Sequence, residues 1–203
     1  MLSEAQARQI EQAVKEAEAS TSSEIAVCIL PASGDDRGMA AVAAVIVFGI
    51  VKEGAPLLWW GLDPLLLTGA AIVAAVAAFW LCDRFDLGLR CLPARLLVKD
   101  ARCAARAAFL DHALDDSPER NAVMLFVSWA ERYVEILPDR AAAAAIEQNH
   151  WNSVIEEFRQ RVNASDLGEA VAHSVAKIGA LCAARFPASG ANPDRVSNRP
   201  FQS

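Results

Sequence analysis

The sequence predicts an α/β fold that is interrupted by an inserted hydrophobic helical hairpin. Three observations lead to this prediction. Apolar residues recur at helical spacing near both ends of the chain, and short apolar runs typical of buried strands lie between them. Two long uncharged segments, residues 38–51 and 64–82, follow the first of these strand-like runs. The chain is long enough to bury a sizeable core beside such an insert.

Four parts of the chain are expected. They are a first helix and strand (1–37), the hairpin (38–82), the remainder of the domain (83–187) and a disordered tail rich in Ser, Asn and Pro (188–203).

The first helix is expected to begin at a capping box that pairs Ser3 with Gln6. Ile10, Val14 and Ala17 mark its buried face at helical spacing. An apolar run over residues 24–30 follows, and such runs are typical of buried strands.

The insert, residues 38–82, is expected to be a transmembrane helical hairpin. A helix rises about 1.5 Å per residue, so the segment 64–82 would span roughly 28 Å, close to the hydrocarbon thickness of a bilayer. The segment 38–51 would reach only about 21 Å and must be extended, tilted or shallow. Two buried helices of a soluble core are the alternative, and the high alanine content of both segments is compatible with it.

The turn of this hairpin is expected to start at Lys52. Lys52 and Glu53 are charged, and Gly54 and Pro56 disfavour a continuous helix. The tryptophans that follow the turn, and Trp80 at the other end of the hairpin, would mark the two membrane interfaces.

Flanking charges predict the orientation of the hairpin. Its loop contains a single basic residue, Lys52, and one arginine, Arg37, precedes it. A basic run follows it: Arg84, Arg90, Arg95, Lys99, Arg102 and Arg106. Positive charge favours the cytoplasmic side, so both termini and the folded domain are expected in the cytoplasm. The run either contacts anionic lipid headgroups or forms a solvated helix face.

Net charge and cysteine spacing exclude several classes of protein. The formal charge of -6 argues against a nucleic-acid partner. The 5 cysteines are scattered singly without CxxC spacing, which indicates neither a disulfide framework nor a zinc site. The first 20 residues are polar, so no signal peptide is expected there.

After the insert, Pro93 is expected to open a helix that runs from Ala94 to about Leu114. Its buried face is predicted at helical spacing, at Leu96, Cys103, Ala107, Leu110 and Leu114. Two strand-like runs follow, residues 121–128 and 133–137, and so short a connection favours a β-hairpin.

Two helices are expected to complete the domain. The first starts at Pro138 and Asp139 and continues through an apolar stripe that includes Trp151 and Phe158. The second is expected to be capped by Asp166 with Glu169. The residues that should face the core in this last helix are Leu167, Val171, Val175, Ile178, Leu181 and Cys182.

Residues 119–137 (ERNAVMLFVSWAERYVEIL) and 178–187 (IGALCAARFP) resemble the TPM domain family, named after a thylakoid lumen protein, a photosystem II repair protein and a nematode receptor modulator. The resemblance extends over residues 2–187, and the inserted hairpin resembles a bacterial membrane-bound branch. It implies an αβα sandwich around a small mixed sheet and a place in the bacterial inner membrane. It also implies acid phosphatase activity, calcium or magnesium binding in some members, and roles in assembling or maintaining membrane complexes.

The chain departs from the family where chemistry would be expected. Many members place an Asp at the head of the helix after the second hairpin strand, but residues 146–151 read IEQNHW here. An amide such as Asn149 would weaken a site for a hard divalent cation, which prefers several converging carboxylate or carbonyl oxygens. Asp35 and Asp36 could ligate a cation, although a turn explains them as well.

The remaining charged residues supply only weak candidates for catalysis. Motifs for nucleotide binding, zinc proteolysis and serine hydrolysis are absent from the sequence. The candidates that border the predicted β-hairpin are Asp115, Asp116, Arg120, Glu131, Arg132 and Glu135. A phosphatase could use such carboxylates and cations, but turns and solvated strand ends need the same residue types.

Two functions are compatible with these observations, and whether the protein is an enzyme stays open. The favoured hypothesis is a non-catalytic, membrane-anchored module that binds a protein partner and helps assemble or maintain a membrane complex. The alternative is a divalent-cation-dependent acid phosphatase held at the membrane.

Overall fold

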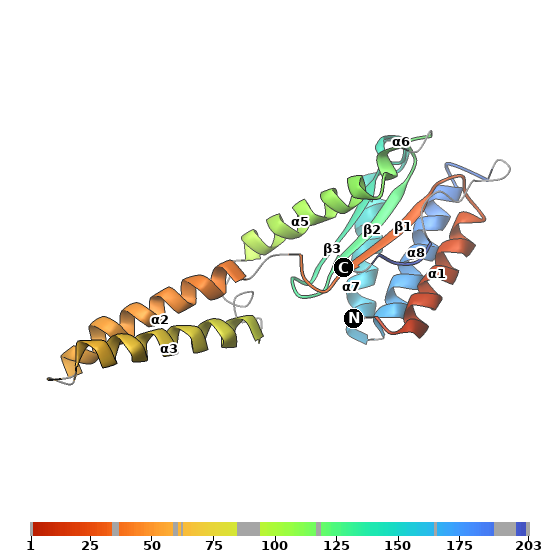
Figure 1. The fold of residues 1–203 in the computed structure, drawn as a ribbon. Coiled ribbons are helices and arrows are strands. Elements are labelled where there is room, and N and C mark those ends of the chain that lie inside the picture. Colours follow the sequence, from red (N-terminus) through yellow and green to blue (C-terminus); the bar gives the residue numbers. More distant parts are fainter. Residues whose placement is uncertain are drawn as a thin grey trace. The chain divides into compact units, whose positions relative to one another are not determined.

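In the computed structural model the chain forms two compact units, Met1–Ser33 with Asp100–Ser203, and Gly34–Lys99. The first is an α/β unit and the second is a helical hairpin, as the sequence predicted (Figure 1). The structure describes residues 2–33, 37–58, 61, 63–84, 94–116, 119–164, 166–188 and 198–201. Asp35, Asp36 and the two tryptophans of the predicted hairpin turn lie outside this part of the chain.

The α/β unit contains a mixed sheet of three strands in the order β1-β2-β3. β1 (Ile25–Leu30) pairs in parallel with β2 (Val123–Ser128), and β2 pairs antiparallel with β3 (Tyr133–Pro138). The predicted β-hairpin is therefore confirmed, and residues 129–132 form its turn. β3 and β1 are the two outer strands of the sheet.

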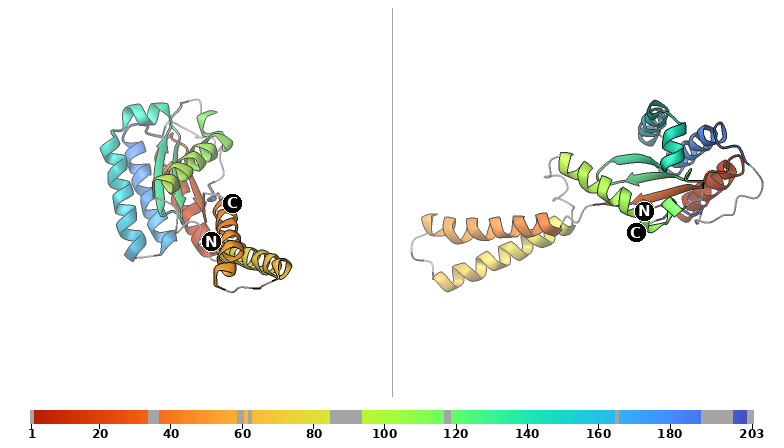
Figure 2. Two further views of the ribbon diagram at one scale, coloured as in Figure 1. Left: turned by 90° about the vertical axis from the view of Figure 1, so that its left-hand side faces the viewer. Right: turned by 90° about the horizontal axis from the view of Figure 1, so that it is seen from above.

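Helices cover both faces of this sheet, so the αβα sandwich is confirmed (Figure 2). Three helices lie on one face: α1 (Glu4–Glu18), α7 (Gln148–Ala164) and α8 (Leu167–Ala183). The opposite face is covered by residues of α5 (Ala94–Asp111), followed by the 3₁₀ turn η1 (Leu114–Asp116).

Alternation along the strands divides the core into two clusters. Val27 and Leu125 point toward α1, α7 and α8, where Trp151 and Phe158 complete the larger cluster. Their neighbours along the strands, such as Phe126, point toward α5. Side chains alternate between the faces of a sheet, so apolar runs of this kind can fill the cores on both sides.

α1 and α8 both begin at the predicted N-cap residues, but the capping hydrogen bonds predicted for α8 are absent. The Ser3 hydroxyl accepts a hydrogen bond from the Gln6 N–H at 3.2 Å, and the Gln6 side chain accepts one from the Ser3 N–H at 2.6 Å. Asp166 occupies the N-cap of α8, yet its carboxylate makes no cap hydrogen bond. It accepts a hydrogen bond from Gln6 Nε2 instead, at 2.5 Å, so the predicted capping box with Glu169 is wrong.

The buried face predicted for α5 is also wrong. Cys103, Ala107 and Leu110 are exposed, whereas Ala101 and Ala105 are fully buried. Small alanine side chains allow the helix backbone to approach the sheet closely. Leu110 lies on the outer side, although the predicted burial of Leu114 is confirmed.

The helix predicted after Pro138 is divided into α6 (Arg140–Ala145) and α7. Ile146 ends α6 in an extended conformation, with φ -119° and ψ 122°. Its side chain is buried in the larger core cluster, so packing takes precedence over the helical preference of the alanine run that precedes it.

Phe201, in the tail that was predicted to be disordered, lies beside β1. The Phe201 N–H donates to the Val27 carbonyl at 2.9 Å, and the Phe201 carbonyl accepts from the Ile29 N–H at 2.9 Å. The Phe201 ring stacks on His112, with ring centroids 3.5 Å apart. This contact does not test the prediction of a disordered tail, which stays a prediction.

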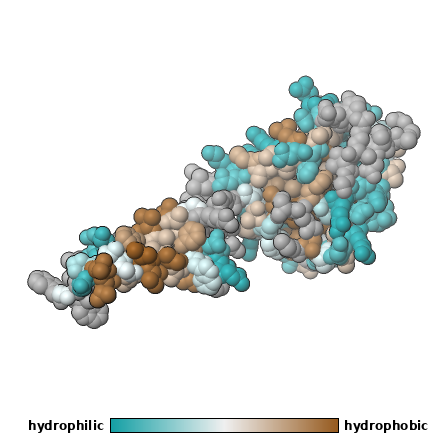
Figure 3. All heavy atoms as spheres, viewed as in Figure 1, coloured by the Kyte–Doolittle hydropathy of each residue, from teal (hydrophilic) through white to brown (hydrophobic). Residues whose placement is uncertain are grey.

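The second unit pairs α2 (Arg37–Leu58) with α3 (Pro64–Arg84), and apolar side chains gather on their surface (Figure 3). The turn does not start at Lys52, because α2 continues through Gly54 and Pro56 to Leu58. The helix of 22 residues is about 33 Å long, but among the described helices α3 alone is both long and apolar enough to cross a membrane.

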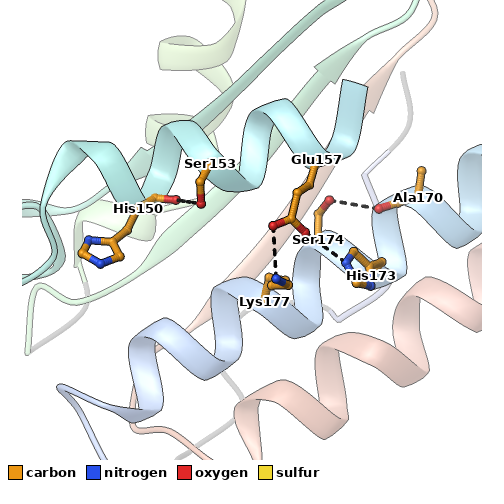
Figure 4. A network of polar contacts seen from close by, with 7 residues as sticks. All are labelled: His150, Ser153, Glu157, Ala170, His173, Ser174 and Lys177. Atoms are coloured by element: carbon orange, nitrogen blue, oxygen red, sulfur yellow. Dashed lines mark hydrogen bonds and ion pairs between the residues drawn. The ribbon is translucent and has the colours of Figure 1, made fainter. Parts of the chain in front are cut away.

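An ionic contact joins α7 to α8 at the surface of the α/β unit (Figure 4). Glu157 accepts a hydrogen bond from Lys177 Nζ at 3.1 Å and lies 3.4 Å from His173 Nε2. Lys177 first, and then His173, lower the pKa of the Glu157 carboxyl. The three side chains are solvated, so we assign this contact a structural role.

Replacing Gly179 with alanine is expected to destabilise the α/β unit. A Cβ atom at this position would lie 2.6 Å from the Cβ of Ala17 and 3.1 Å from its Cα, so α8 and α1 would have to separate. Overpacking costs about 1–3 kcal/mol, whereas alanine gains about 1 kcal/mol over glycine in a helix. We expect a net loss of roughly 1 kcal/mol in the free energy of unfolding by denaturant titration.

Ala176→Gly is the matched control, because Ala176 is exposed on the same helix. It should lose about 1 kcal/mol through helix propensity alone. A stabilising effect of Gly179→Ala would contradict the close helix contact.

Cys103 is expected to react with iodoacetamide much faster than Cys28 or Cys182. Burial raises the pKa of the Cys28 and Cys182 thiols to about 11, so only about a thousandth of each is thiolate at pH 8. Cys103 is exposed on α5. Peptide mapping by mass spectrometry should find Cys28 and Cys182 modified only after unfolding in guanidinium; rapid labelling of either in the native protein would contradict their burial.

Candidate functional site

A groove of about 820 Å³ runs along the outer edge of β3. The strand forms its floor, α5 contributes one wall and α7 contributes the other. The charged side chains that line it are Arg102, Arg106, Glu135, Glu156 and Arg159. Both walls are helices packed on the sheet, so the groove follows directly from β3 being an outer strand.

A cluster of three polar side chains lies where β3 faces α5. Glu135 Oε1 lies 3.6 Å from Arg102 Nε, and the Tyr133 hydroxyl donates to Glu135 Oε2 at 2.7 Å. Burial and the hydrogen bond to Glu135 raise the pKa of the Tyr133 hydroxyl, while Arg102 opposes this rise. Tyr133 and Glu135 raise the pKa of Arg102. Glu135 is therefore held by both neighbours against the α5 wall.

A second hollow, of about 460 Å³, lies at the turn between β2 and β3. Trp129 and Arg132 line it, together with residues near the end of α7. It shares Tyr133, Val134 and Arg159 with the groove along β3, so the two hollows adjoin each other.

Ser128 joins the segments that follow β1 and β2. Its buried hydroxyl lies 2.9 Å from the Ser33 hydroxyl and donates to the Glu131 carboxylate. The other oxygen of that carboxylate accepts from the Ser33 N–H at 2.8 Å. Glu131 therefore closes the β2–β3 turn and fixes the start of the segment that leads to the hairpin unit.

Arg120 lies at the other end of β2 and has φ 53°, which few residues other than glycine adopt. Its guanidinium donates to the Asp115 carbonyl, and its Nε lies 3.1 Å from Asp139 Oδ2. Asp139 is 6% exposed and accepts from the Arg140 N–H at 2.7 Å. This arrangement fixes the segment before β2 to the start of α6.

The structure does not bring the predicted site residues together. Arg120 contacts Asp115 only through a backbone carbonyl, Glu135 contacts Arg102, and Arg132 lies in the β2–β3 turn with φ 51°. The side chain of Asp116 lies outside the described residues. Within the described part of the chain, no three His, Cys, Asp or Glu side chains are close enough to share a metal ion. The assignment of catalytic roles to these residues stays a prediction.

Residues 146–151, which were expected to lack the Asp of a cation site, lead into the start of α7. Asn149 Nδ2 donates to the Glu147 carboxylate there, at 3.2 Å, and both side chains are exposed. This amide therefore donates to a neighbouring carboxylate and does not itself supply the negative charge that a hard cation prefers.

Tyr133 and Arg159 were not singled out from the sequence as site residues. The alternation of Tyr133, Glu135 and Leu137 along β3 could have indicated which side chains share the α5 side. No comparable local pattern identifies Arg159, because it comes from α7 and reaches the groove only in the folded chain.

Paired charges line the groove. The two glutamates that line it lie near arginines, Glu135 near Arg102 and Glu156 near Arg159 at 3.9 Å. Guanidinium groups recognise carboxylates through charge-assisted hydrogen bonds.

Comparison with known proteins agrees with this fold. The family model described as the TPM domain matches residues 97–181. No curated protein matches the chain. The solution structure of the BA42 protein from the psychrophilic bacterium Bizionia argentinensis is similar, with a TM-score of 0.61 and 13% identity over 100% of this chain and 96% of that one. Such low identity shows the fold alone, and the TPM domain model matches residues 97–181, which is less than half of the chain.

Proposed function

We propose that this protein is a membrane-anchored TPM domain protein that acts as a non-catalytic interaction module. It helps to assemble or maintain a membrane complex at the bacterial inner membrane. The α2–α3 hairpin lies in the bilayer, and both termini and the α/β unit lie in the cytoplasm.

The apolar surface of the hairpin carries this proposal. α3 has 21 residues and is long and apolar enough to cross a membrane. Only 6% of its most apolar 18-residue stretch is buried within the structure. Large side chains such as Leu65, Val73 and Val76 are exposed along it, as are Val45 and Ile50 on α2. Apolar surface of this extent is unfavourable in water, and a bilayer would cover it.

The proposed orientation rests on the distribution of basic residues. α3 ends at Arg84, and Lys99, Arg102 and Arg106 follow, whereas Lys52 is the basic residue near the loop of the hairpin. The excess of positive charge beside the ends of the hairpin favours the cytoplasmic side for these ends.

An interaction role is favoured over phosphatase chemistry by the groove along β3. Its arginines lie beside glutamates on the groove walls, and no cluster of carboxylates is present among the described residues. The family resemblance still allows calcium or magnesium to bind, so the alternative needs a direct test.

Calorimetric titration of calcium and magnesium into the full chain in lipid nanodiscs provides this test, together with a p-nitrophenyl phosphate assay at acid and neutral pH. We expect neither stoichiometric binding nor turnover. Stoichiometric binding of either cation with turnover that depends on it would overturn the proposal in favour of the phosphatase.

A further inference from the structure

We propose that the outer edge of β3 binds an extended, acidic segment of a partner protein, which joins the sheet as a fourth strand. This inference rests on the proposed function as an interaction module and identifies the surface and the kind of partner.

The backbone of β3 has hydrogen-bonding groups that point away from β2. Asp139 donates its N–H to the Ala122 carbonyl at 2.8 Å, so this pair is hydrogen-bonded. Such pairs alternate along an antiparallel ladder, and therefore Val134 and Ile136 direct their N–H and C=O groups toward the groove. Outside the strand ladder, no hydrogen bond of these two backbones is found within the described residues.

The opposite edge of the sheet shows how such groups are satisfied in this fold. Phe201 lies beside β1 and exchanges backbone hydrogen bonds with Val27 and Ile29. The chain thus covers the β1 edge with its own residues. In the described part of the chain, β3 has no equivalent neighbour.

The usual protections of an edge strand are weak in β3. Proteins often block an edge with lysine, proline or a bulge. Pro138 lies at the last position of β3, where it leaves Val134 and Ile136 unaffected. Glu135 places a charge in the middle of β3. Arg102 and Tyr133 hold its side chain over the α5 face of the sheet, so it does not extend across the edge.

The groove has space for an added strand, and its excess of arginines favours a strand with negative charge. A volume of about 820 Å³ is typical of a binding groove, and β3 has 6 residues, so its edge is about 20 Å long. The groove and the adjoining hollow are lined by Arg102, Arg106, Arg132 and Arg159 against Glu135 and Glu156. This local excess of positive charge contrasts with the net charge of -6 of the whole chain.

Arg106 is the side chain best placed to select an acidic partner. It is exposed on the α5 wall and has no ion pair within the described residues. Alternate side chains of an added strand would face α5, where Arg102 and Arg106 lie, and the others would face α7, where Ile155 lines the groove. A segment with Glu or Asp alternating with β-branched residues therefore fits best.

The test uses the full chain in lipid nanodiscs and a peptide labelled with fluorescein at its N-terminus, fluoresceinyl-Thr-Glu-Val-Glu-Thr-Glu-Val-Thr-amide. We expect saturable binding by fluorescence anisotropy, and slower hydrogen exchange at the Val134 and Ile136 amides. A peptide with Lys in place of Glu should bind at least tenfold more weakly. A peptide N-methylated at alternate backbone nitrogens should lose binding, because it cannot pair with the strand.

The variant Arg106→Glu/Arg159→Glu should weaken binding of the acidic peptide at least tenfold. Arg8→Glu is the matched control, because Arg8 is exposed on α1 and does not line the groove, and it should bind like the natural chain. Unchanged affinity of the double variant, or unchanged exchange at Val134 and Ile136, would overturn the inference.

Three further outcomes are informative. Concentration-dependent protection of the Val134 and Ile136 amides without peptide would show that a second copy of this chain occupies the edge, which also overturns the inference. A chain that stays in membranes but does not bind the peptide would remove only the β3 proposal. A chain that leaves membranes would remove the proposed anchoring.

Discussion

Replacing Val73 and Val76 together by arginine is expected to release the protein from lipid vesicles in a flotation assay. Both side chains are exposed near the middle of α3, at 69% and 63%. An arginine at the centre of a transmembrane helix costs about 2.5–3.5 kcal/mol on insertion scales, so two should cost about 6 kcal/mol. Each 1.4 kcal/mol changes an equilibrium constant tenfold. A cost of about 6 kcal/mol should therefore lower the partition of the protein into vesicles by about four factors of ten.

Leu110→Arg is the control for this variant. Leu110 is exposed on α5, outside the hairpin, and its replacement should leave flotation unchanged. The circular dichroism of both proteins should show that the α/β unit is still folded. If the double variant floats with the vesicles as the natural chain does, α3 does not lie in the hydrocarbon.

The second large effect is expected at Trp151, whose replacement by alanine should destabilise the α/β unit by about 3–5 kcal/mol. Trp151 is 1% exposed and belongs to the core cluster between α7, α8 and the sheet. Its removal would leave a large cavity that the surrounding helices cannot fill without moving. The free energy of unfolding can be followed by circular dichroism during denaturant titration.

Two further substitutions separate the causes of this effect. The indole N–H of Trp151 has no hydrogen-bond partner within the described residues, so Trp151→Phe removes an unpaired donor and should cost less than the alanine variant. Trp129→Ala should change stability by no more than about 0.5 kcal/mol, because Trp129 is 55% exposed in the β2–β3 turn. A cost at Trp151 as small as that at Trp129 would mean that α7 is not packed on the sheet as described.

Much of the fold could be predicted because it depends on local patterns. The capping box at Ser3 needs only two residues at fixed spacing, and the β2–β3 hairpin needs two apolar runs with a short connection. The apolar hairpin follows from length and absence of charge. Each of these patterns lies within one short stretch of the sequence, so the sequence alone specifies it.

Other elements depend on tertiary contacts that local patterns do not contain. The buried face of α5 is set by alanines that approach the sheet, and a pattern of large apolar residues therefore predicted the wrong side. Ile146 ends α6 because its side chain reaches the core. Phe201 pairs with β1, more than 170 residues away in the sequence.

The candidate site was the least predictable part. Asp115, Arg120, Arg132 and Glu135 are near one another in sequence, yet the strands carry them to different ends and faces of the sheet. The groove was missed because its walls come from α5 and α7 and its floor from β3. Only the knowledge that β3 is an outer strand brings these segments together.

Extraction of membranes with alkaline carbonate tests the central claim, that a hydrophobic hairpin anchors the α/β unit in the bilayer. High salt and carbonate screen or disrupt ionic attraction to lipid headgroups, but they do not remove a helix whose apolar side chains lie in hydrocarbon. The full chain should therefore stay in the membrane pellet and dissolve only in detergent. Release into the carbonate supernatant would show that α2 and α3 do not insert, and would contradict the proposed anchoring.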